Sequence, residues 1–176
     1  MRRILIIGPG GAGKSTLARA LGRRLGLEVF HLDKFYWRPG WVEPPKDEWL
    51  KILEGLTARD AWIMDGNYSG TLDLRLARCD AVVFLDLPRT VCLRGIAKRR
   101  LAYRAKARPD MAEGCRERLT LEFVRWVWGY ARRSRPKVLA RLASAAPEKR
   151  IIHLRSRREV EQFLAAPNKW SELSAG

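Results

Sequence analysis

The sequence has few of the residues that build metal sites and disulfide frameworks. Its 176 residues include three cysteines and two histidines, with no CxxC pair and no Cys/His cluster at metal-ligand spacing. This scarcity excludes a zinc-finger fold and a disulfide-stapled secreted fold. The cysteines are expected to be ordinary thiols of a reducing compartment, and both histidines fall in predicted strands as structural residues. These residues are Cys79, Cys92, Cys115, His31 and His153.

Long apolar runs are also absent. No run approaches the roughly 20 residues that a membrane-spanning helix needs, so we expect no membrane partner and a cytoplasmic location. Apolar residues still make up 47% of the chain, which is enough for a domain with a real core. We expect a single domain over residues 1–166, followed by a tail at 167–176.

Acidic residues are scarce relative to basic ones. The chain has 19 Asp and Glu against 35 Lys and Arg, a formal net charge of +16. The excess is uneven, because residues 89–137 hold 15 basic and 4 acidic residues. Such a stretch attracts phosphate groups, either of nucleotides or of a nucleic-acid backbone. A solvated basic helix face is the alternative for any single arginine within it.

One motif stands out against this background. Residues 8–15 read Gly-Pro-Gly-Gly-Ala-Gly-Lys-Ser and fill every fixed position of the phosphate-binding P-loop, G-x-x-x-x-G-K-[ST]. An apolar run at 4–7 precedes the motif and a helical leucine pattern follows it, as the motif requires. Backbone N–H groups and the helix N-terminus can then hold phosphate. The expected nucleotide-binding residues are Gly8, Gly10, Gly11, Ala12, Gly13, Lys14 and Ser15.

The chemistry expected of this motif is specific. Lys14 can reach the β- and γ-phosphates, and the Ser15 hydroxyl can ligate Mg²⁺. The same glycines also fit the dinucleotide fingerprint G-x-G-x-x-G, with Asp33 about twenty residues further on. The Lys-Ser pair favours the P-loop, because the dinucleotide loop needs no lysine there.

Apolar runs alternate with helical patterns along the rest of the chain. Strands are predicted near 4–7, 27–33, 61–66, 81–86 and 151–154, with helices between them. This alternation predicts an α/β fold with a parallel, doubly wound sheet. Ligands of such sheets bind at the carboxyl ends of the strands.

Three acidic residues end predicted strands. We expect Asp65 to organise the metal, with Asp86 a weaker candidate for the same role. Asp33 either orients and deprotonates an acceptor hydroxyl or caps a turn. Trp37 and Trp41 flank a loop that could grip a planar or sugar-like acceptor. On the basic helix, cations suited to the charge of a transferring phosphoryl group are Arg94, Lys98, Arg99 and Arg100.

Together these segments resemble the adenylate-kinase-like P-loop kinases and, more closely, the bacterial DNA topology modulation proteins. The resemblance extends from the P-loop through HLDKFYWRPGW, WIMDGNYSGTLDLRL, VVFLDLPR, KRRLAYRAKARPDMAEGC and EFVRWVWGYARRSRP. It implies a three-layer αβα sandwich with five parallel strands in the order 2-3-1-4-5, and a short basic lid at about 95–112. It also implies ATP with Mg²⁺ as the phosphoryl donor.

The resemblance also implies roles for individual residues. Asp65 and Ser15 would organise the metal, and Thr16 would touch the α-phosphate. Arg94 would pack near the adenine, while Lys98 and Arg99 would close over the phosphates. The nucleoside monophosphate kinase signature Asp-Gly-Phe-Pro-Arg is replaced by DGNYS at 65–69, so the arginine that holds an acceptor phosphate is missing.

The sequence therefore predicts a kinase that transfers the γ-phosphoryl group of ATP to a small nucleotide-like or hydroxylated acceptor. The residues expected to carry the reaction are Lys14, Asp33, Arg94, Lys98 and Arg99. The alternative is an ATP-dependent, nucleic-acid-associated protein that influences DNA topology. We favour it less, because no DNA-reading module is recognisable. The oligomeric state is left open.

Overall fold

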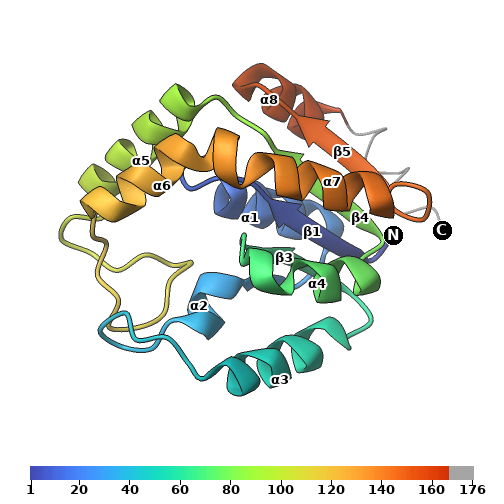
Figure 1. The fold of residues 1–176 in the computed structure, drawn as a ribbon, viewed down its shortest axis with the longest axis horizontal. Helices are drawn as coiled ribbons and strands as arrows, with labels where there is room; N and C mark the ends of the chain where they lie inside the picture. The colour runs from blue at the N-terminus through green and yellow to red at the C-terminus, as the bar shows by residue number, and fades with distance from the viewer. Residues whose placement is uncertain (167–176) are drawn as a thin grey trace.

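Five parallel strands form the centre of the protein in the order β2-β3-β1-β4-β5 (Figure 1). The strands are β1 Arg3–Ile7, β2 Val29–His31, β3 Trp62–Asp65, β4 Ala81–Leu85 and β5 Arg150–Leu154. The computed structural model describes residues 1–166, and the predicted tail at 167–176 lies outside the described residues. The strand order and the parallel pairing confirm the predicted α/β fold.

Helices cover both faces of the sheet. They are α1 Lys14–Leu25, α2 Leu32–Tyr36, α3 Lys46–Thr57, α4 Leu72–Arg78, α5 Arg89–Ala102, α6 Leu121–Arg133, α7 Arg135–Ala145 and α8 Arg157–Ala165, with a 3₁₀ turn, η1, at Ser69–Thr71. Alternate residues of β1 point to opposite faces. Ile4 and Ile6 pack with α1, α5 and α8, whereas Leu5 and Ile7 pack with α3, α4 and α7.

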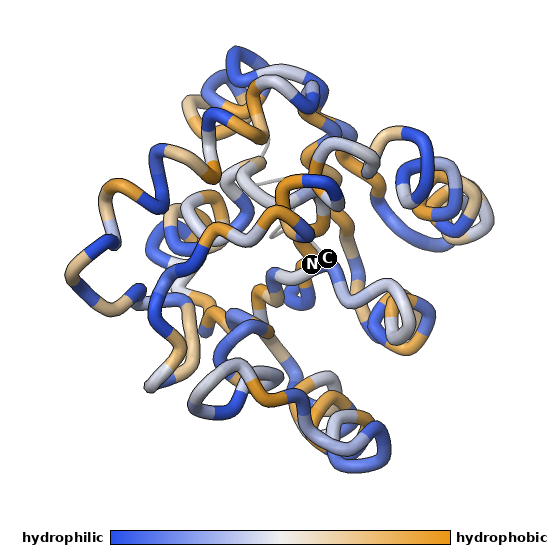
Figure 2. Tube along the Cα trace, turned by 60° about the vertical axis from the view of Figure 1, so that its left-hand side comes forward, coloured by the Kyte–Doolittle hydropathy of each residue, from blue (hydrophilic) through white to orange (hydrophobic). Residues whose placement is uncertain are grey.

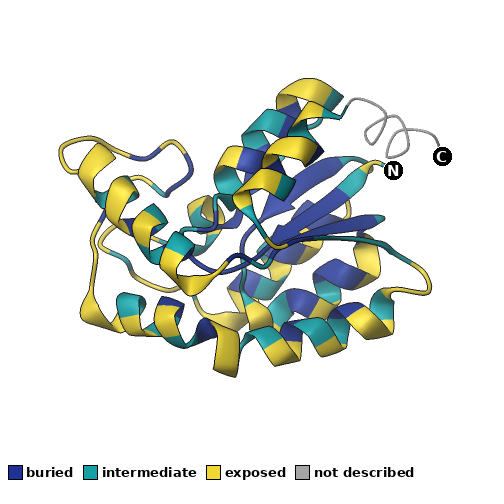
Figure 3. Cartoon of the chain, turned by 90° about the horizontal axis from the view of Figure 1, so that it is seen from above, coloured by how far each residue is buried: buried dark blue, intermediate teal, exposed yellow. Residues whose placement is uncertain are grey.

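This layering places the buried residues between the helices. Figure 3 shows most strand residues as buried, with β5 largely intermediate, while the outward faces of the helices are exposed. Hydrophilic and hydrophobic positions alternate along the helices in Figure 2, as expected for helices with one face on a sheet. None of the helices within residues 1–166 is long and apolar enough to cross a membrane.

One sequence expectation needs correction. The strand predicted at 27–33 is shorter, because the chain turns into α2 at Leu32 and Asp33 lies in the first turn of that helix. The segment expected to form a lid, 95–112, includes the last part of α5, which ends at Ala102, and the first part of an irregular segment, 103–120. Ile96 is buried against the sheet, which holds its part of α5 in the core.

Candidate active site

The P-loop backbone connects β1 to α1 through three glycines with positive φ. These are Gly8 at 146°, Gly11 at 79° and Gly13 at 97°, conformations that L-residues with a Cβ rarely adopt. A Cβ on Gly11 would lie 2.1 Å from the carbonyl oxygen of Cys92, and a Cβ on Gly95 would lie 2.2 Å from the oxygen of Gly11. Helix α5 therefore lies directly against the loop.

Lys14 is the first residue of α1 and folds back over the loop. Its Nζ donates a hydrogen bond to the Pro9 carbonyl at 3.0 Å. Burial lowers the pKa of Lys14, and the nearby carboxylates of Asp65 and Asp33 oppose that shift. The half-buried ammonium group thus lies at the cleft, where two acids oppose the effect of burial on its pKa.

A cleft of about 1320 Å³ opens at the carboxyl edge of the sheet. Its lining includes most of the residues predicted as a site, while Gly8 and Ala12 are buried and lie outside the lining. Arg100 and Asp86 do not line the cleft either. The predicted residues that the cleft does bring together are Gly10, Gly11, Gly13, Lys14, Ser15, Thr16, Asp33, Asp65, Arg94, Lys98 and Arg99.

Asp65 ends β3 beside β2. Adjacent strand ends pair His31 with Asp65 in the sheet register, and His31 Nδ1 shares a short hydrogen bond with Asp65 Oδ1. Both side chains are buried. The histidine therefore fixes the orientation of the carboxylate, a contact that the separate strand patterns did not reveal.

Asp86, the weaker metal candidate, has a structural role. Its carboxylate accepts hydrogen bonds from Arg135 Nε, at 2.8 and 2.9 Å, and lies 2.8 Å from His153 Nε2. These contacts join the end of β4 to β5 and to the start of α7.

Asp33 faces the cleft from α2. Tyr68 donates its hydroxyl to Asp33 Oδ1 at 2.7 Å. Burial raises the pKa of Asp33, while the Tyr68 hydrogen bond and the Lys14 charge partly oppose the rise. A carboxylate with a raised pKa is suited to accept a proton from a hydroxyl group.

The backbone that carries Tyr68 is held by Arg75, which is fully buried on α4. Its guanidinium donates to the carbonyl oxygens of Gly66, Asn67 and Tyr68 at 2.9, 2.8 and 2.7 Å. Burial lowers the pKa of Arg75 to about 10. Because Arg75 serves the backbone, it does not replace the missing acceptor-phosphate arginine.

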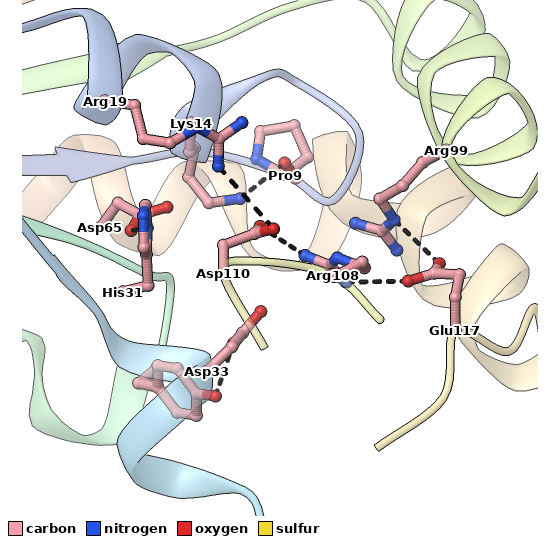
Figure 4. A network of polar contacts seen from close by, with 11 residues as sticks. Pro9, Lys14, Arg19, His31, Asp33, Asp65, Arg99, Arg108, Asp110 and Glu117 are labelled. Carbon is pink, nitrogen blue, oxygen red and sulfur yellow. Dashed lines mark hydrogen bonds and ion pairs between the residues drawn. The ribbon is translucent and has the colours of Figure 1, made fainter. Parts of the chain in front are cut away.

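Segment 103–120 contributes three buried charged residues, Arg108, Asp110 and Glu117 (Figure 4). Arg108 and Asp110 line the cleft. Arg108 donates to Asp110 Oδ2 at 2.6 Å and to Glu117 Oε2 at 2.9 Å. Glu117 also accepts from Arg99 Nε at 2.8 Å, and Asp110 Oδ1 lies 3.8 Å from Arg19 Nη1. Sequence reasoning missed these partners because an irregular segment has no periodicity. The mixed charges of 105–114 were the available signal.

The ion pairs shift the pKa values of their members. Burial alone would raise the pKa of Asp110, but the Arg108 hydrogen bond and charge outweigh it and lower the value to about 2. Burial would lower the pKa of Arg108, yet its two carboxylates raise it above the ordinary value. Segment 103–120 is therefore held over the P-loop by buried charges.

Replacing Asp110 with asparagine is expected to change acid stability. The folded carboxylate has a depressed pKa, so its stabilisation is present above the unfolded pKa and is lost as pH falls from about 4 to about 2. That loss is about 2 kcal/mol in the parent protein, and the variant should lack it. Urea unfolding from pH 7 to pH 2 tests this, with exposed Glu113→Gln of the same segment as control. Parallel curves for the parent and Asp110→Asn would contradict it.

Comparison with known proteins adds relatives and a fold. No protein-family model matches the chain. YqaC of Bacillus subtilis (strain 168), described as uncharacterized, is 30% identical over 127 residues, covering 71% of this chain and 70% of that protein. The shikimate kinase of Blochmanniella floridana is 58% identical over 33 residues, 19% of this chain and 18% of that protein.

Several solved kinases share the architecture. The shikimate kinase of Acinetobacter baumannii, in complex with shikimate, matches at a TM-score of 0.57 and 15% identity, over 99% of this chain and 95% of that one. A sugar kinase of Janibacter sp. HTCC2649 matches at a TM-score of 0.54 and 19% identity, over 99% of this chain and 96% of that one. The deoxyadenosine kinase of M. mycoides matches at a TM-score of 0.53 and 14% identity, over 98% of this chain and 99% of that one.

These matches fix the fold and the family. At such low identity the solved structures establish the architecture of P-loop kinases. The relatives named above carry other descriptions, so the resemblance to DNA topology modulation proteins stays a prediction. The long match to YqaC spans more than two thirds of both chains. The chain belongs to the same protein family as YqaC of Bacillus subtilis and has the fold of the P-loop kinases.

Proposed function

We propose that the protein is a kinase that transfers the γ-phosphoryl group of ATP to a hydroxyl group of a small acceptor. The observation that carries this proposal is the placement of Lys14 and Asp33 in one cleft. Both side chains line the same cleft, and the charge of each opposes the burial-driven shift in the pKa of the other. A transferred phosphoryl group needs such groups on its two sides.

The metal expected with ATP fits the residues present. The Ser15 hydroxyl and the Asp65 carboxylate both line the cleft beside the loop, and Mg²⁺ prefers oxygen ligands of this kind. His31 already orients the carboxylate, as outer partners of metal ligands do. Bound Mg²⁺ would neutralise charge on the phosphates.

The reaction can be written for this chain's own side chains. The acceptor oxygen forms a bond to the γ-phosphorus, the bond from that phosphorus to the β,γ-bridging oxygen breaks, and ADP leaves. The hydroxyl proton passes to Asp33. Lys14 binds the transferring group from the opposite side. Arg94, Lys98 and Arg99 line the cleft from α5. An ion pair with Glu117 holds Arg99 in position.

Replacing Asp33 with asparagine tests the acceptor side. The amide cannot accept the proton, so we expect phosphoryl transfer to fall by about 10²–10⁴-fold, with ATP affinity unchanged. Phosphorylated product and ATP binding should be measured in parallel. Asp60→Asn is the matched control, because Asp60 is exposed and precedes β3 at the opposite edge of the sheet. A loss confined to ATP affinity would contradict the assignment.

The pH dependence offers a second measurement on Asp33. Because burial raises the pKa of Asp33, the carboxylate is protonated at a higher pH than an exposed aspartate. Transfer should therefore decline on acidification with a midpoint above the usual pKa of about 3.9. The residual activity of Asp33→Asn should lack that decline.

A further inference from the structure

The acceptor end of the cleft has an aromatic wall, formed by Tyr36, Trp37, Trp41 and Tyr68. The ring centroids of Trp37 and Trp41 lie 5.2 Å apart, and the angle between the ring planes is 63°. The Tyr36 ring contacts the Trp37 ring edge-on, with 5.0 Å between the ring centroids, and its centroid lies 4.6 Å from that of Tyr68. Three wall residues, Trp37, Trp41 and Tyr68, line the cleft together with Asp33, so the wall stands beside the carboxylate that receives the acceptor proton.

Trp41 has a strained backbone conformation that its neighbours hold in place. Its φ of 68° lies in the left-handed region, which costs on the order of 1 kcal/mol for a residue with a Cβ. Its Nε1 donates to the Arg116 carbonyl at 3.1 Å, and the Arg118 guanidinium lies 4.7 Å from its ring centre. Such strain is maintained where the surroundings fix the residue, and it clusters at ligand sites.

The charges at this end favour an uncharged acceptor. Arg108 is neutralised by two carboxylates, Asp110 and Glu117, and Arg118 is exposed and stacked on Trp41. Asp33 and Glu43 both line the cleft. An anionic acceptor would be repelled by these two carboxylates. Among the described residues that line this end of the cleft, no buried arginine without a carboxylate partner offsets that repulsion.

We propose that the acceptor is an uncharged polyhydroxylated ring, of the sugar or cyclic polyol class, whose apolar face packs on Trp37 and Trp41. Its hydroxyl groups donate to Asp33 and Glu43. This inference rests on the proposed kinase function and narrows the acceptor of the same site. Aromatic side chains suit such a ligand, because they offer a flat apolar surface next to polar partners.

Paired probes that differ in one charged group test the proposal. We would compare D-glucose with D-glucuronate, methyl shikimate with shikimate, and deoxyadenosine with its 5′-monophosphate, measuring binding by tryptophan fluorescence and calorimetry. The uncharged member of at least one pair should bind 10-fold or more tightly than its anionic partner. Equal or tighter binding of the anionic members, or no binding by any of the six, would overturn the proposal.

Variants connect that preference to the wall. Trp37→Leu should weaken binding of the uncharged probe at least 10-fold, whereas Trp128→Leu should not, because Trp128 is exposed on α6 and lies outside the cleft. Glu43→Gln should shrink the preference for the uncharged member. If Arg118→Gln instead weakens the anionic probe more than the uncharged one, the acceptor is anionic and the proposal fails.

Product formation separates this inference from the kinase proposal. With Mg²⁺ and ATP present, phosphorylated product should accumulate from the uncharged probe and ADP should accompany it. If binding prefers the uncharged probe and no phosphorylated product forms, the kinase proposal fails while the charge preference stands. If an anionic probe is phosphorylated faster, the kinase proposal stands and the acceptor class is wrong.

Discussion

Lys14→Ala is expected to reduce phosphoryl transfer by at least about 10²–10³-fold while the fold persists. The ammonium group lies in the P-loop with its Nζ on the Pro9 carbonyl, and two carboxylates face it. Removing it leaves the β- and γ-phosphates without their main protein cation. Phosphorylated product formed at saturating ATP and magnesium is the measurement.

Stability separates a catalytic loss from a folding loss. Burial lowers the pKa of Lys14, so at neutral pH the folded state gains nothing from keeping this charge. The alanine variant should therefore melt at or above the temperature of the parent protein. Lys51→Ala, on the exposed face of α3, is the control. Retained transfer in Lys14→Ala would remove the P-loop from the mechanism.

Arg75→Met should produce the largest loss of stability. The methionine keeps the apolar stem, but the carbonyls of Gly66, Asn67 and Tyr68 lose their donors inside the protein. We expect a loss of about 3–5 kcal/mol in the free energy of unfolding. For a chain of this size that corresponds to a melting temperature lower by roughly 6–20 °C.

The matched control comes from the same helix. Arg78 is exposed on α4, so Arg78→Met should change the free energy of unfolding by less than about 0.5 kcal/mol. Calorimetric melting of both variants makes the comparison. If the two melt alike, Arg75 does not organise the segment that carries Tyr68. Acceptor phosphorylation in Arg75→Met should also fall, because Tyr68 holds Asp33.

Local patterns were sufficient to predict the P-loop and the strands around it. The P-loop motif encodes its own geometry, since glycines at 8, 11 and 13 permit the positive φ values that the loop adopts. The apolar runs predicted the strands, and parallel pairing then brought Lys14, Asp33 and Asp65 into one cleft. Lys14 follows β1 through the P-loop, Asp65 ends β3, and Asp33 lies two residues after β2. Their placement therefore depends on topology that the alternation already implies.

The contacts of segment 103–120 could not be predicted in the same way. Arg108, Asp110 and Glu117 have no helical or strand spacing, and they find one another only when 103–120 folds over the P-loop. The basic excess of that region also gave an incomplete picture. Arg99 and Arg108 are ion-paired with carboxylates of the same stretch, which leaves less free charge for a nucleic acid than the count implies.

The contact between Gly11 and Gly95 fixes how closely the P-loop and α5 can approach each other. A Cβ added at Gly11 or Gly95 would lie 2.1 or 2.2 Å from a carbonyl oxygen of the opposing element, so no side chain fits between the two backbones. Gly11→Ala or Gly95→Ala would therefore force the P-loop and α5 apart. Such a separation would displace the part of α5 that carries Arg94 and Lys98 relative to the P-loop.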